Sequence, residues 1–329
     1  MKTMSIAASL AMAVGSVIAT PASAGKCQAK DAGTIDEFPL SAGSDSAYIA
    51  VGSDKRVWIT DGSNDRIRAA DSWGNVTEYA LAAGSGPLGI AAGPDGRLWF
   101  VESGSNKIGA ISTCGEVTEY AIPTGNSNPF GITSGSDGNL WFTEATANKV
   151  ARITTSGDVT EFPLPTAASQ PRGITRDSTG NLWVAEFFAR KIAMVTTSGA
   201  VTEYPLATTA GRPMALTAGP DKKIWFTTTK SVSAIDGQGA VTDYPLAVGA
   251  GAQGITVGPD ANIWFTEGDA NKVARITPAG VLTEFDLPHA GALPSGITFF
   301  PYRGCASLDL LFVERFGARL GRVRAVTTR

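Results

Sequence analysis

Residues 128–165 read NPFGITSGSDGNLWFTEATANKVARITTSGDVTEFPLP, and close copies of this stretch recur along the chain. Each copy contains four short runs of alternating apolar and polar residues, separated by Gly, Asp, Pro or Ser. Four antiparallel strands joined by tight turns require this pattern. A single sheet of four strands exposes an apolar face on each side, so it is stable only when neighbours cover both faces. The stretch therefore predicts one blade of an all-β propeller.

The tryptophan of each copy gives the number of blades. Six tryptophans stand in register, 39 to 42 residues apart: Trp58, Trp99, Trp141, Trp183, Trp225 and Trp264. A seventh copy has Leu311 at this position, after an insertion around residues 300–309. We interpret the Trp-Phe pair of each copy as packing between blades. The chain is predicted to be a seven-bladed β-propeller of four-stranded antiparallel blades.

The two ends of the chain are expected to close the ring. Six copies end in an outer strand such as Val-Thr-Glu-Tyr, whereas the last copy stops near Val323 to Val326 without one. Residues 34–40, Thr-Ile-Asp-Glu-Phe-Pro-Leu, match the missing strand. Pairing of this N-terminal strand with the C-terminal blade would remove an open sheet edge.

The first 24 residues have the pattern of a cleaved secretory signal. Met1 and Lys2 precede an apolar run at 6–18, and Ala-Ser-Ala follows at 22–24. We predict a signal peptide over 1–24, one propeller domain over 25–329, and a secreted or periplasmic product. The apolar run is too short to span a bilayer, so no membrane insertion is expected. A net charge of −3 gives no basic field for nucleic acid, and we expect a monomer whose partner is a small-molecule ligand.

The chain has three cysteines. Cys27 precedes the N-terminal strand, and Cys305 lies in the insertion of the same closing blade. We predict a disulfide between Cys27 and Cys305, which an oxidising compartment would allow. Cys114, in a turn of the second blade, is expected to be a free thiol, since no His or second Cys is near it in sequence.

Residues 128–165 closely resemble the virginiamycin B lyase (streptogramin lyase) family, and the resemblance extends over all seven repeats. It implies a seven-bladed propeller in which Mg²⁺ and a histidine base open the ester linkage of a cyclic depsipeptide antibiotic by elimination. The repeat is specific for the fold of the family and not for its reaction. The catalytic residues therefore have to be compared one by one.

Most of the family's catalytic groups are replaced in this chain. Its Glu-Pro-His-Gly-Ile segment, which supplies a carboxylate and the base, corresponds here to residues 293–297, Leu-Pro-Ser-Gly-Ile. The other active-site histidine corresponds to Gln253, and the second metal carboxylate to Glu314. Elimination needs a base and a cation that stabilises the enolate. Only Glu314 remains, so we do not expect streptogramin cleavage itself.

The single histidine of the chain, His289, lies in the connection that enters the last blade, on the same face as Glu314. It could replace the missing base. Its alignment with Thr124 and Thr166 favours a surface position toward the rim.

Two rings of residues are expected at one end of the central channel. The first ring consists of the residues before each Gly-Ile-Thr motif: Ala47, Leu88, Phe130, Arg172, Met214, Gln253 and Ser295. The second consists of the residues that close each Trp-Phe-Thr-Glu run: Asp61, Glu102, Glu144, Glu186, Thr228, Glu267 and Glu314. The carboxylates of the second ring could bind Mg²⁺ or Ca²⁺. Alternatively, they form a repeated salt bridge with the lysines of the neighbouring Asn-Lys motifs.

Departures from the repeat indicate a ligand pocket at the same end. Phe130, Arg172, Met214, Phe187 and Phe188 are specific to single blades. Together they would form a partly apolar pocket with one fixed cation, suited to a ligand with an apolar body and an anionic or carbonyl group. Side chains that plug the channel are the alternative.

Two functional hypotheses follow. The first is a metal-assisted lyase or hydrolase of an ester or lactone, in which Glu267 and Glu314 bind the metal and Arg172 orients the substrate. His289 or a metal-bound water would be its base. The second is a noncatalytic exported propeller that binds a small molecule, glycan or protein on the channel face, with Phe130, Arg172, Met214, Gln253 and Ser295 as binding residues.

Overall fold

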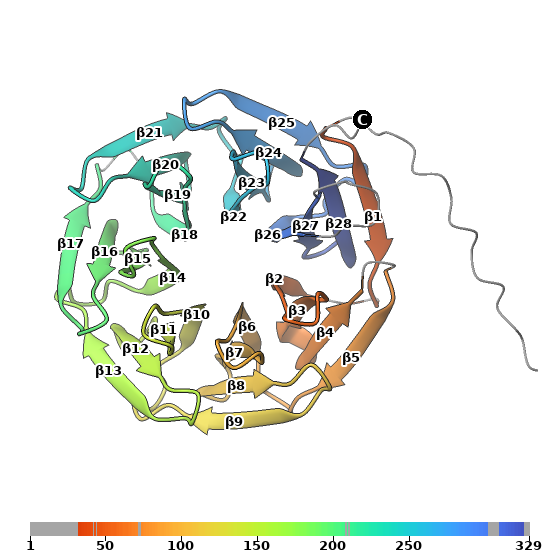
Figure 1. Ribbon diagram of the computed structural model, residues 1–329. Coiled ribbons are helices and arrows are strands. Elements are labelled where there is room, and N and C mark those ends of the chain that lie inside the picture. The colour runs from red at the N-terminus through yellow and green to blue at the C-terminus, as the bar shows by residue number, and fades with distance from the viewer. Residues whose placement is uncertain are drawn as a thin grey trace, which may run out of the picture.

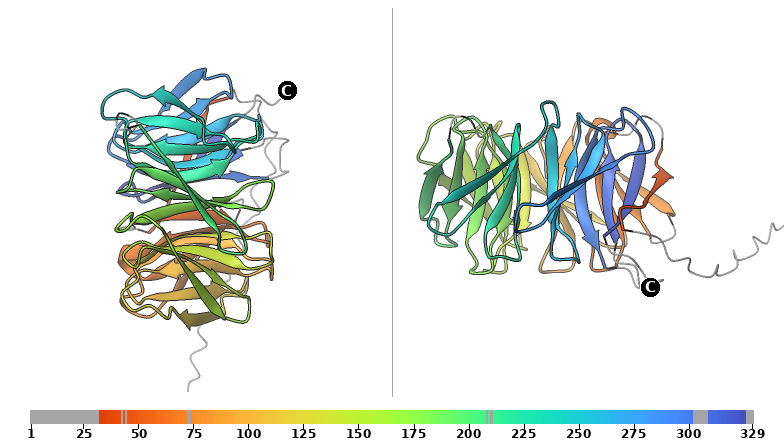
Figure 2. Two further views of the ribbon diagram at one scale, coloured as in Figure 1. Left: turned by 90° about the vertical axis from the view of Figure 1, so that its left-hand side faces the viewer. Right: turned by 90° about the horizontal axis from the view of Figure 1, so that it is seen from above.

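The computed structural model describes residues 32–325, except positions 42, 44, 72–73, 208, 210 and 302–308. These residues form seven antiparallel sheets of four strands each. Figure 1 shows the sheets as blades around a central axis, with the strands β2, β6, β10, β14, β18, β22 and β26 innermost. Figure 2 shows the same ring from its edge, with the blades standing side by side. The predicted seven-bladed β-propeller is confirmed.

Six blades are each made of four consecutive strands, and a short 3-10 helix (Gly62–Asn64) follows β3. Blades 1 to 3 contain β2 (Ser46–Val51), β3 (Val57–Asp61), β4 (Arg66–Ala70), β5 (Val76–Ala80), β6 (Pro87–Ala92), β7 (Leu98–Glu102), β8 (Lys107–Ile111), β9 (Val117–Ala121), β10 (Pro129–Ser134), β11 (Leu140–Glu144), β12 (Lys149–Ile153) and β13 (Val159–Pro163). Blades 4 to 6 contain β14 (Pro171–Arg176), β15 (Leu182–Glu186), β16 (Lys191–Val195), β17 (Val201–Pro205), β18 (Pro213–Ala218), β19 (Ile224–Thr228), β20 (Ser231–Ile235), β21 (Val241–Pro245), β22 (Ala252–Val257), β23 (Ile263–Glu267), β24 (Lys272–Ile276) and β25 (Leu282–Asp286).

The seventh blade combines both ends of the described chain. It contains β26 (Pro294–Phe300), β27 (Asp309–Glu314), β28 (Arg319–Arg324) and, as its outer strand, β1 (Ile35–Pro39). Ile35 lies opposite Val323, and Pro39 lies opposite Arg319. Figure 1 shows β1, in red, beside β28, in dark blue. The predicted closure is therefore confirmed, and this blade has no open outer edge at β28.

The tryptophans of the repeat fill the spaces between blades. Trp141 is fully buried and stacks on Phe162 of its own blade, with 5.3 Å between ring centroids. It belongs to a buried apolar cluster that includes Val184 of the next blade. The indole N–H donates to the Asp137 carboxylate in the preceding turn, at 3.2 Å. Burial of an aromatic ring between two sheets is what makes each blade depend on its neighbour.

Part of the sequence-based prediction concerns residues outside the described ranges. The signal peptide over 1–24 lies there, as do Cys27 and Cys305, so their disulfide stays a prediction. Cys114 is a free, exposed thiol, as expected. The described residues contain no helix with the length and hydropathy needed to cross a membrane.

Candidate functional site: the channel pocket

A bulge in each inner strand places one side chain at the central channel. Strand β10 shifts register between Pro129 and Ile132. Phe130 and Gly131 therefore lie opposite Thr143 alone. A bulge re-aims the side chain at its position, and the Phe130 side chain lines the channel pocket. Register shifts at the corresponding place occur in the other inner strands.

The glycine after the bulged residue lets two inner strands approach closely. A Cβ atom on Gly131 would lie 2.6 Å from the backbone oxygen of Arg172 in the next blade. Thr143 bridges the same two strands, because its Oγ1 accepts from Gly131 N at 2.9 Å and donates to Arg172 O at 2.7 Å. The Gly-Ile-Thr and Trp-Phe-Thr motifs thus bring the inner strands together around a narrow channel.

The first-ring residues meet in one pocket with a volume of about 420 Å³. All seven line its wall: Ala47, Leu88, Phe130, Arg172, Met214, Gln253 and Ser295. The volume falls in the range of small-molecule sites, roughly 300 to 1,000 Å³. The structure brings these residues together as the repeat indicated, while their role in binding a ligand stays a prediction. Phe187 and Phe188, which were expected in the same pocket, are not among the residues that line it.

Two arginines line the pocket, and they differ in their partners. Arg315 forms an ion pair with Asp45 across the junction of the last and first blades. Arg172 has no carboxylate partner among the described residues. Its Nη2 donates to Gln170 Oε1 at 3.2 Å, and its guanidinium carbon lies 3.6 Å from the centre of the Phe187 ring. Arg172 is therefore the uncompensated positive charge of the pocket wall.

Tyr48 and Arg315 are among the residues of the wall that sequence reasoning missed. Tyr48 stands where blade 3 has Gly131, and its ring meets the Phe130 ring edge-on, with centroids 5.9 Å apart. Arg315 stands where blade 4 has Phe187. Both positions depart from the repeat, so a comparison of every column of the repeat could have found them.

The second ring does not line the pocket. Its members end the second strand of each blade and are 0 to 1% exposed: Asp61, Glu102, Glu144, Glu186, Thr228, Glu267 and Glu314. None belongs to the pocket wall. The expectation of carboxylates around an open channel is wrong, because side chains on a strand project from the faces of the sheet, and here neighbouring blades cover those faces.

The repeated salt bridge involves a different glutamate from the one expected. Lys149 lies opposite Glu144 in the strand ladder, but its Nζ contacts Glu161 Oε2 of the outer strand at 2.5 Å. Thr124, in the connection from the preceding blade, donates to Glu161 from its backbone N at 2.9 Å and its Oγ1 at 2.8 Å. Equivalent pairs join Lys107 to Glu119, Lys191 to Glu203 and Lys272 to Glu284.

Burial raises the pKa of each glutamate of the second ring. Burial and the nearby charge of Glu161 raise the pKa of Glu144 to about 7. Burial and the charge of Glu203 raise the pKa of Glu186 to about 8. Desolvation disfavours the charged form of a carboxyl group. A carboxyl group that keeps its proton is a poor ligand for a hard divalent cation.

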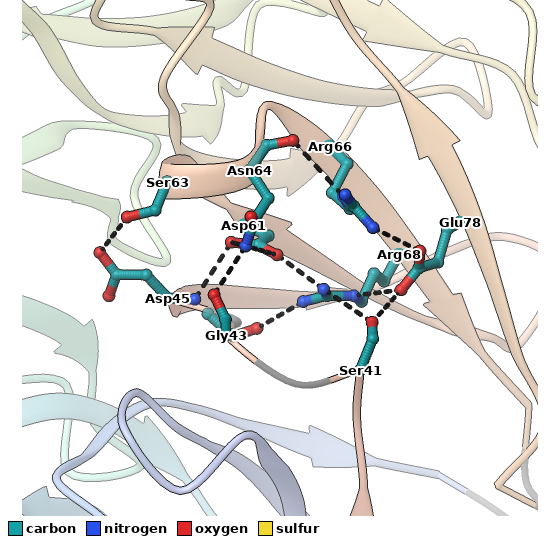
Figure 3. A network of polar contacts seen from close by, with 10 residues as sticks. Ser41, Gly43, Asp45, Asp61, Ser63, Asn64, Arg66, Arg68 and Glu78 are labelled. Carbon is teal, nitrogen blue, oxygen red and sulfur yellow. Dashed lines mark hydrogen bonds and ion pairs between the residues drawn. The ribbon is translucent and has the colours of Figure 1, made fainter.

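Blade 1 stabilises its second-ring carboxylate with an arginine (Figure 3). Arg68 Nη2 lies 2.7 Å from Asp61 Oδ2, and both side chains are almost completely buried. Arg68 also donates from Nε to Glu78 Oε1 at 2.9 Å and from Nη1 to Ser46 Oγ at 3.1 Å. Asn64 Nδ2 donates to both carboxylate oxygens of Asp61. This carboxylate is enclosed by donors and is not directed at the channel pocket.

His289 lies away from the pocket wall. Its Nδ1 contacts the Glu37 carboxylate of β1, and its side chain is 53% exposed. Glu37 stands in β1 where Glu161 stands in β13, so His289 occupies the place of Thr124. The structure agrees with the rim position indicated by that alignment. It does not bring His289 together with the residues that line the pocket.

Glu267 and Glu314, the expected metal ligands, do not fit a divalent-cation site. Burial and the charge of Glu284 raise the pKa of Glu267 to about 7, and burial and the charge of Glu37 raise that of Glu314 to about 8. Within the described ranges, no group of three or more His, Cys, Asp or Glu side chains could hold a metal ion. Binding of Mg²⁺ or Ca²⁺ stays a prediction.

Comparison with known proteins agrees with the repeat and with the closed ring. The model of the virginiamycin B lyase family matches residues 5–248 and 213–328. The chain belongs to the virginiamycin B lyase family. No curated protein sequence matches it.

Solved structures of other members of the family resemble this chain over most of its length. A streptogramin B lyase structure is 32% identical, with a TM-score of 0.82, and the match covers 88% of this chain and 96% of that one. A catalytically inactive virginiamycin B lyase from Staphylococcus aureus, solved with quinupristin, is also 32% identical, with a TM-score of 0.82 and coverage of 88% and 99%. Hydrazine synthase from Kuenenia stuttgartiensis, at 15% identity, a TM-score of 0.73 and coverage of 88% and 98%, shares the fold alone.

The positions that the resemblance assigns to catalytic histidines lie in the pocket wall of this virginiamycin B lyase family member. They are occupied by Gln253 and Ser295. Ser295 Oγ donates to the backbone oxygen of Ser46 at 3.2 Å. No His, Asp or Glu is found among the described residues that line the pocket.

Proposed function

We propose that this member of the family is an exported binding propeller, which takes a small molecule with an apolar body and an anionic or carbonyl group into the channel pocket. The observation that most supports this is the convergence of the whole first ring on one cavity of about 420 Å³. Phe130 and Met214 offer apolar surface, and Gln253 and Ser295 offer neutral hydrogen-bonding groups. Arg172 offers a positive charge without a carboxylate partner among the described residues.

The chemistry of the pocket wall favours binding over cleavage. Elimination from an ester requires a base close to the proton beside the carbonyl. Among the described residues of the wall there is no carboxylate or imidazole. Arg172 can stabilise negative charge, but it stays protonated and cannot take up a proton. Glu314 is buried within its blade, and His289 contacts the Glu37 carboxylate away from the pocket, so neither side chain is placed to act as the base.

Ligand binding can be tested with the fluorescent probe 1-anilinonaphthalene-8-sulfonate, which has an apolar body and an anionic group. We expect saturable binding to the wild type and its loss in Met214→Trp, because the indole would fill the pocket. Val248→Trp adds the same side chain at a fully exposed position and should bind as the wild type does. Equal binding by all three proteins would contradict the proposal.

A metal-assisted lyase or hydrolase of an ester or lactone is the second candidate. Family membership and the relative solved with quinupristin support it. The test is incubation with quinupristin and Mg²⁺, followed by liquid chromatography and mass spectrometry. Ring opening by elimination gives an isomer of unchanged mass at a new retention time, and hydrolysis adds one water. We expect intact quinupristin, and either product would support the lyase or hydrolase instead.

A further inference from the structure

Two arginines lie over one phenylalanine ring beside the channel pocket. The guanidinium carbon of Arg172 is 3.6 Å from the centre of the Phe187 ring, and that of Arg212 is 5.3 Å from the same centre. Arg212 also lies 4.9 Å from the Phe188 ring, which is half exposed. Arg172 itself lines the pocket. The cluster therefore extends from the pocket wall to the surface.

Among the described residues, no carboxylate compensates the positive charges of this cluster. Neither guanidinium has a carboxylate partner in the part of the chain that the structure describes. Arg315, the other arginine of the pocket wall, is paired with Asp45. Burial lowers the pKa of the Arg172 guanidinium, and the like charge of Arg212 lowers it further. Two such cations repel each other, and a bound anion would relieve that repulsion.

The cluster arises where two adjacent blades depart from the repeat together. Phe187 and Phe188 of blade 4 stand where blade 3 has Ala145 and Thr146. Arg212, at the start of blade 5, stands where blades 3 and 4 have Asn128 and Gln170, and Arg172 stands where blade 3 has Phe130. Stacking on an aromatic face holds a guanidinium in one orientation and leaves its N–H groups free at the edge. Guanidinium groups held in this way are suited to bidentate binding of a carboxylate.

We propose that Arg172 and Arg212 form a carboxylate-binding site, so that the ligand of the channel pocket is an apolar carboxylic acid. The carboxylate contacts the guanidinium groups beside Phe187, and the apolar body lies inside the pocket against Phe130 and Met214. This inference rests on the proposed function and narrows it to one class of ligand. A mostly apolar wall suits a ligand with a single charged group at one end.

The test uses two probes with the same apolar body, 2-naphthylacetate and the neutral 2-naphthylacetamide, in isothermal titration calorimetry at neutral pH. We expect the wild type to bind the carboxylate about tenfold more tightly, since hydrogen bonds to charged groups are the stronger ones. Arg172→Gln should lose this preference and keep its affinity for the amide. Arg176→Gln is the matched control, because Arg176 lies on the same strand, is exposed and bonds to Gly135 O.

The outcomes separate the inference from the proposed function. Equal affinity of the wild type for both probes would overturn the carboxylate site and leave pocket binding in place. An unchanged preference in Arg172→Gln would overturn it as well. Arg212→Gln, which alters a residue nearer the surface, should weaken carboxylate binding alone and provides the same test if Arg172→Gln does not fold. Failure of both probes to bind the wild type would contradict the proposed function and this inference together.

Discussion

His289 and Glu37 contact each other, although 252 residues separate them in the chain. Glu37 lies on the N-terminal strand β1, and His289 lies in the connection that enters the last blade. Thr124 and Glu161 make the corresponding contact in blade 3, with Thr124 Oγ1 at 2.8 Å from the carboxylate. The closing blade thus reproduces an inter-blade contact of the repeat with residues from the two ends of the ring.

This contact predicts a structural role for His289. His289→Ala should lower the free energy of unfolding by on the order of 1 kcal/mol, because the largely buried Glu37 carboxylate loses a partner. His289→Thr restores the side chain found at Thr124 and should recover part of that loss. Urea unfolding measures both variants. Ligand binding in the channel pocket should not change, and a binding loss without a stability loss would contradict the structural role.

The buried glutamates predict a loss of stability in alkali. Glu186 has a pKa of about 8 in the folded protein, against about 4.5 for an exposed glutamate. Between about pH 4.5 and pH 8 the folded state therefore binds more protons than the unfolded state. The protonated Glu186 side chain makes its whole contribution to the free energy of unfolding below about pH 4.5, and this contribution is lost as the pH rises through about 8. Glu186→Gln should leave stability nearly unchanged at about pH 5 and increase it by on the order of 1 kcal/mol at about pH 9.

The measurement is the thermal unfolding midpoint of the wild type and of Glu186→Gln, compared at each pH between about 5 and about 9. The difference between the two proteins matters, since other carboxyl groups, such as Glu78 with a pKa lowered to about 2, titrate alike in both. A variant that is less stable than the wild type at alkaline pH would show that Glu186 carries a stabilising charge.

The glycine beside the bulge predicts a steric effect. Gly131→Ala should cost about 1 to 3 kcal/mol of unfolding free energy, because the new Cβ would press on the backbone oxygen of Arg172 and the backbone cannot move without shifting the next blade. Gly125→Ala is the control, since a Cβ there has no atom within 4 Å. Equal stability of the two variants in urea unfolding would show that the inner strands are not tightly packed.

The burial of Glu314 and its raised pKa predict that divalent cations do not stabilise the protein. Thermal unfolding with added Mg²⁺ or Ca²⁺ should give the same midpoint as unfolding with a chelator, because a bound ion would raise the midpoint by mass action. Glu314→Gln should behave in the same way as the wild type toward both ions. A cation-dependent rise that disappears in Glu314→Gln would restore the metal-site hypothesis.

The fold could be predicted because it depends on short-range patterns repeated many times. The Trp58 to Trp264 register fixed the blade length, and the match of residues 34–40 to the missing outer strand predicted the closure. Pairing of Ile35 with Val323 confirms it. The position before the Gly-Ile-Thr motif also predicted which residues reach the channel, since Phe130 and its equivalents line the pocket.

The environment of the carboxyl groups could not be predicted in the same way. Register places Lys149 opposite Glu144, and sequence alone favours an ion pair between them. The long lysine side chain instead reaches Glu161 on the outer strand, which leaves Glu144 buried and largely without donors. Arg212 was missed because its importance depends on Phe187, a residue of another blade, and no spacing within the repeat indicates that contact.

The most direct test of the account is a crystal structure of the wild-type protein with 2-naphthylacetate. We predict that the naphthyl ring lies in the channel pocket against Phe130 and Met214, with the carboxylate within hydrogen-bonding distance of Arg172. A structure in which the probe binds elsewhere, or in which side chains fill the pocket and exclude it, would contradict the account.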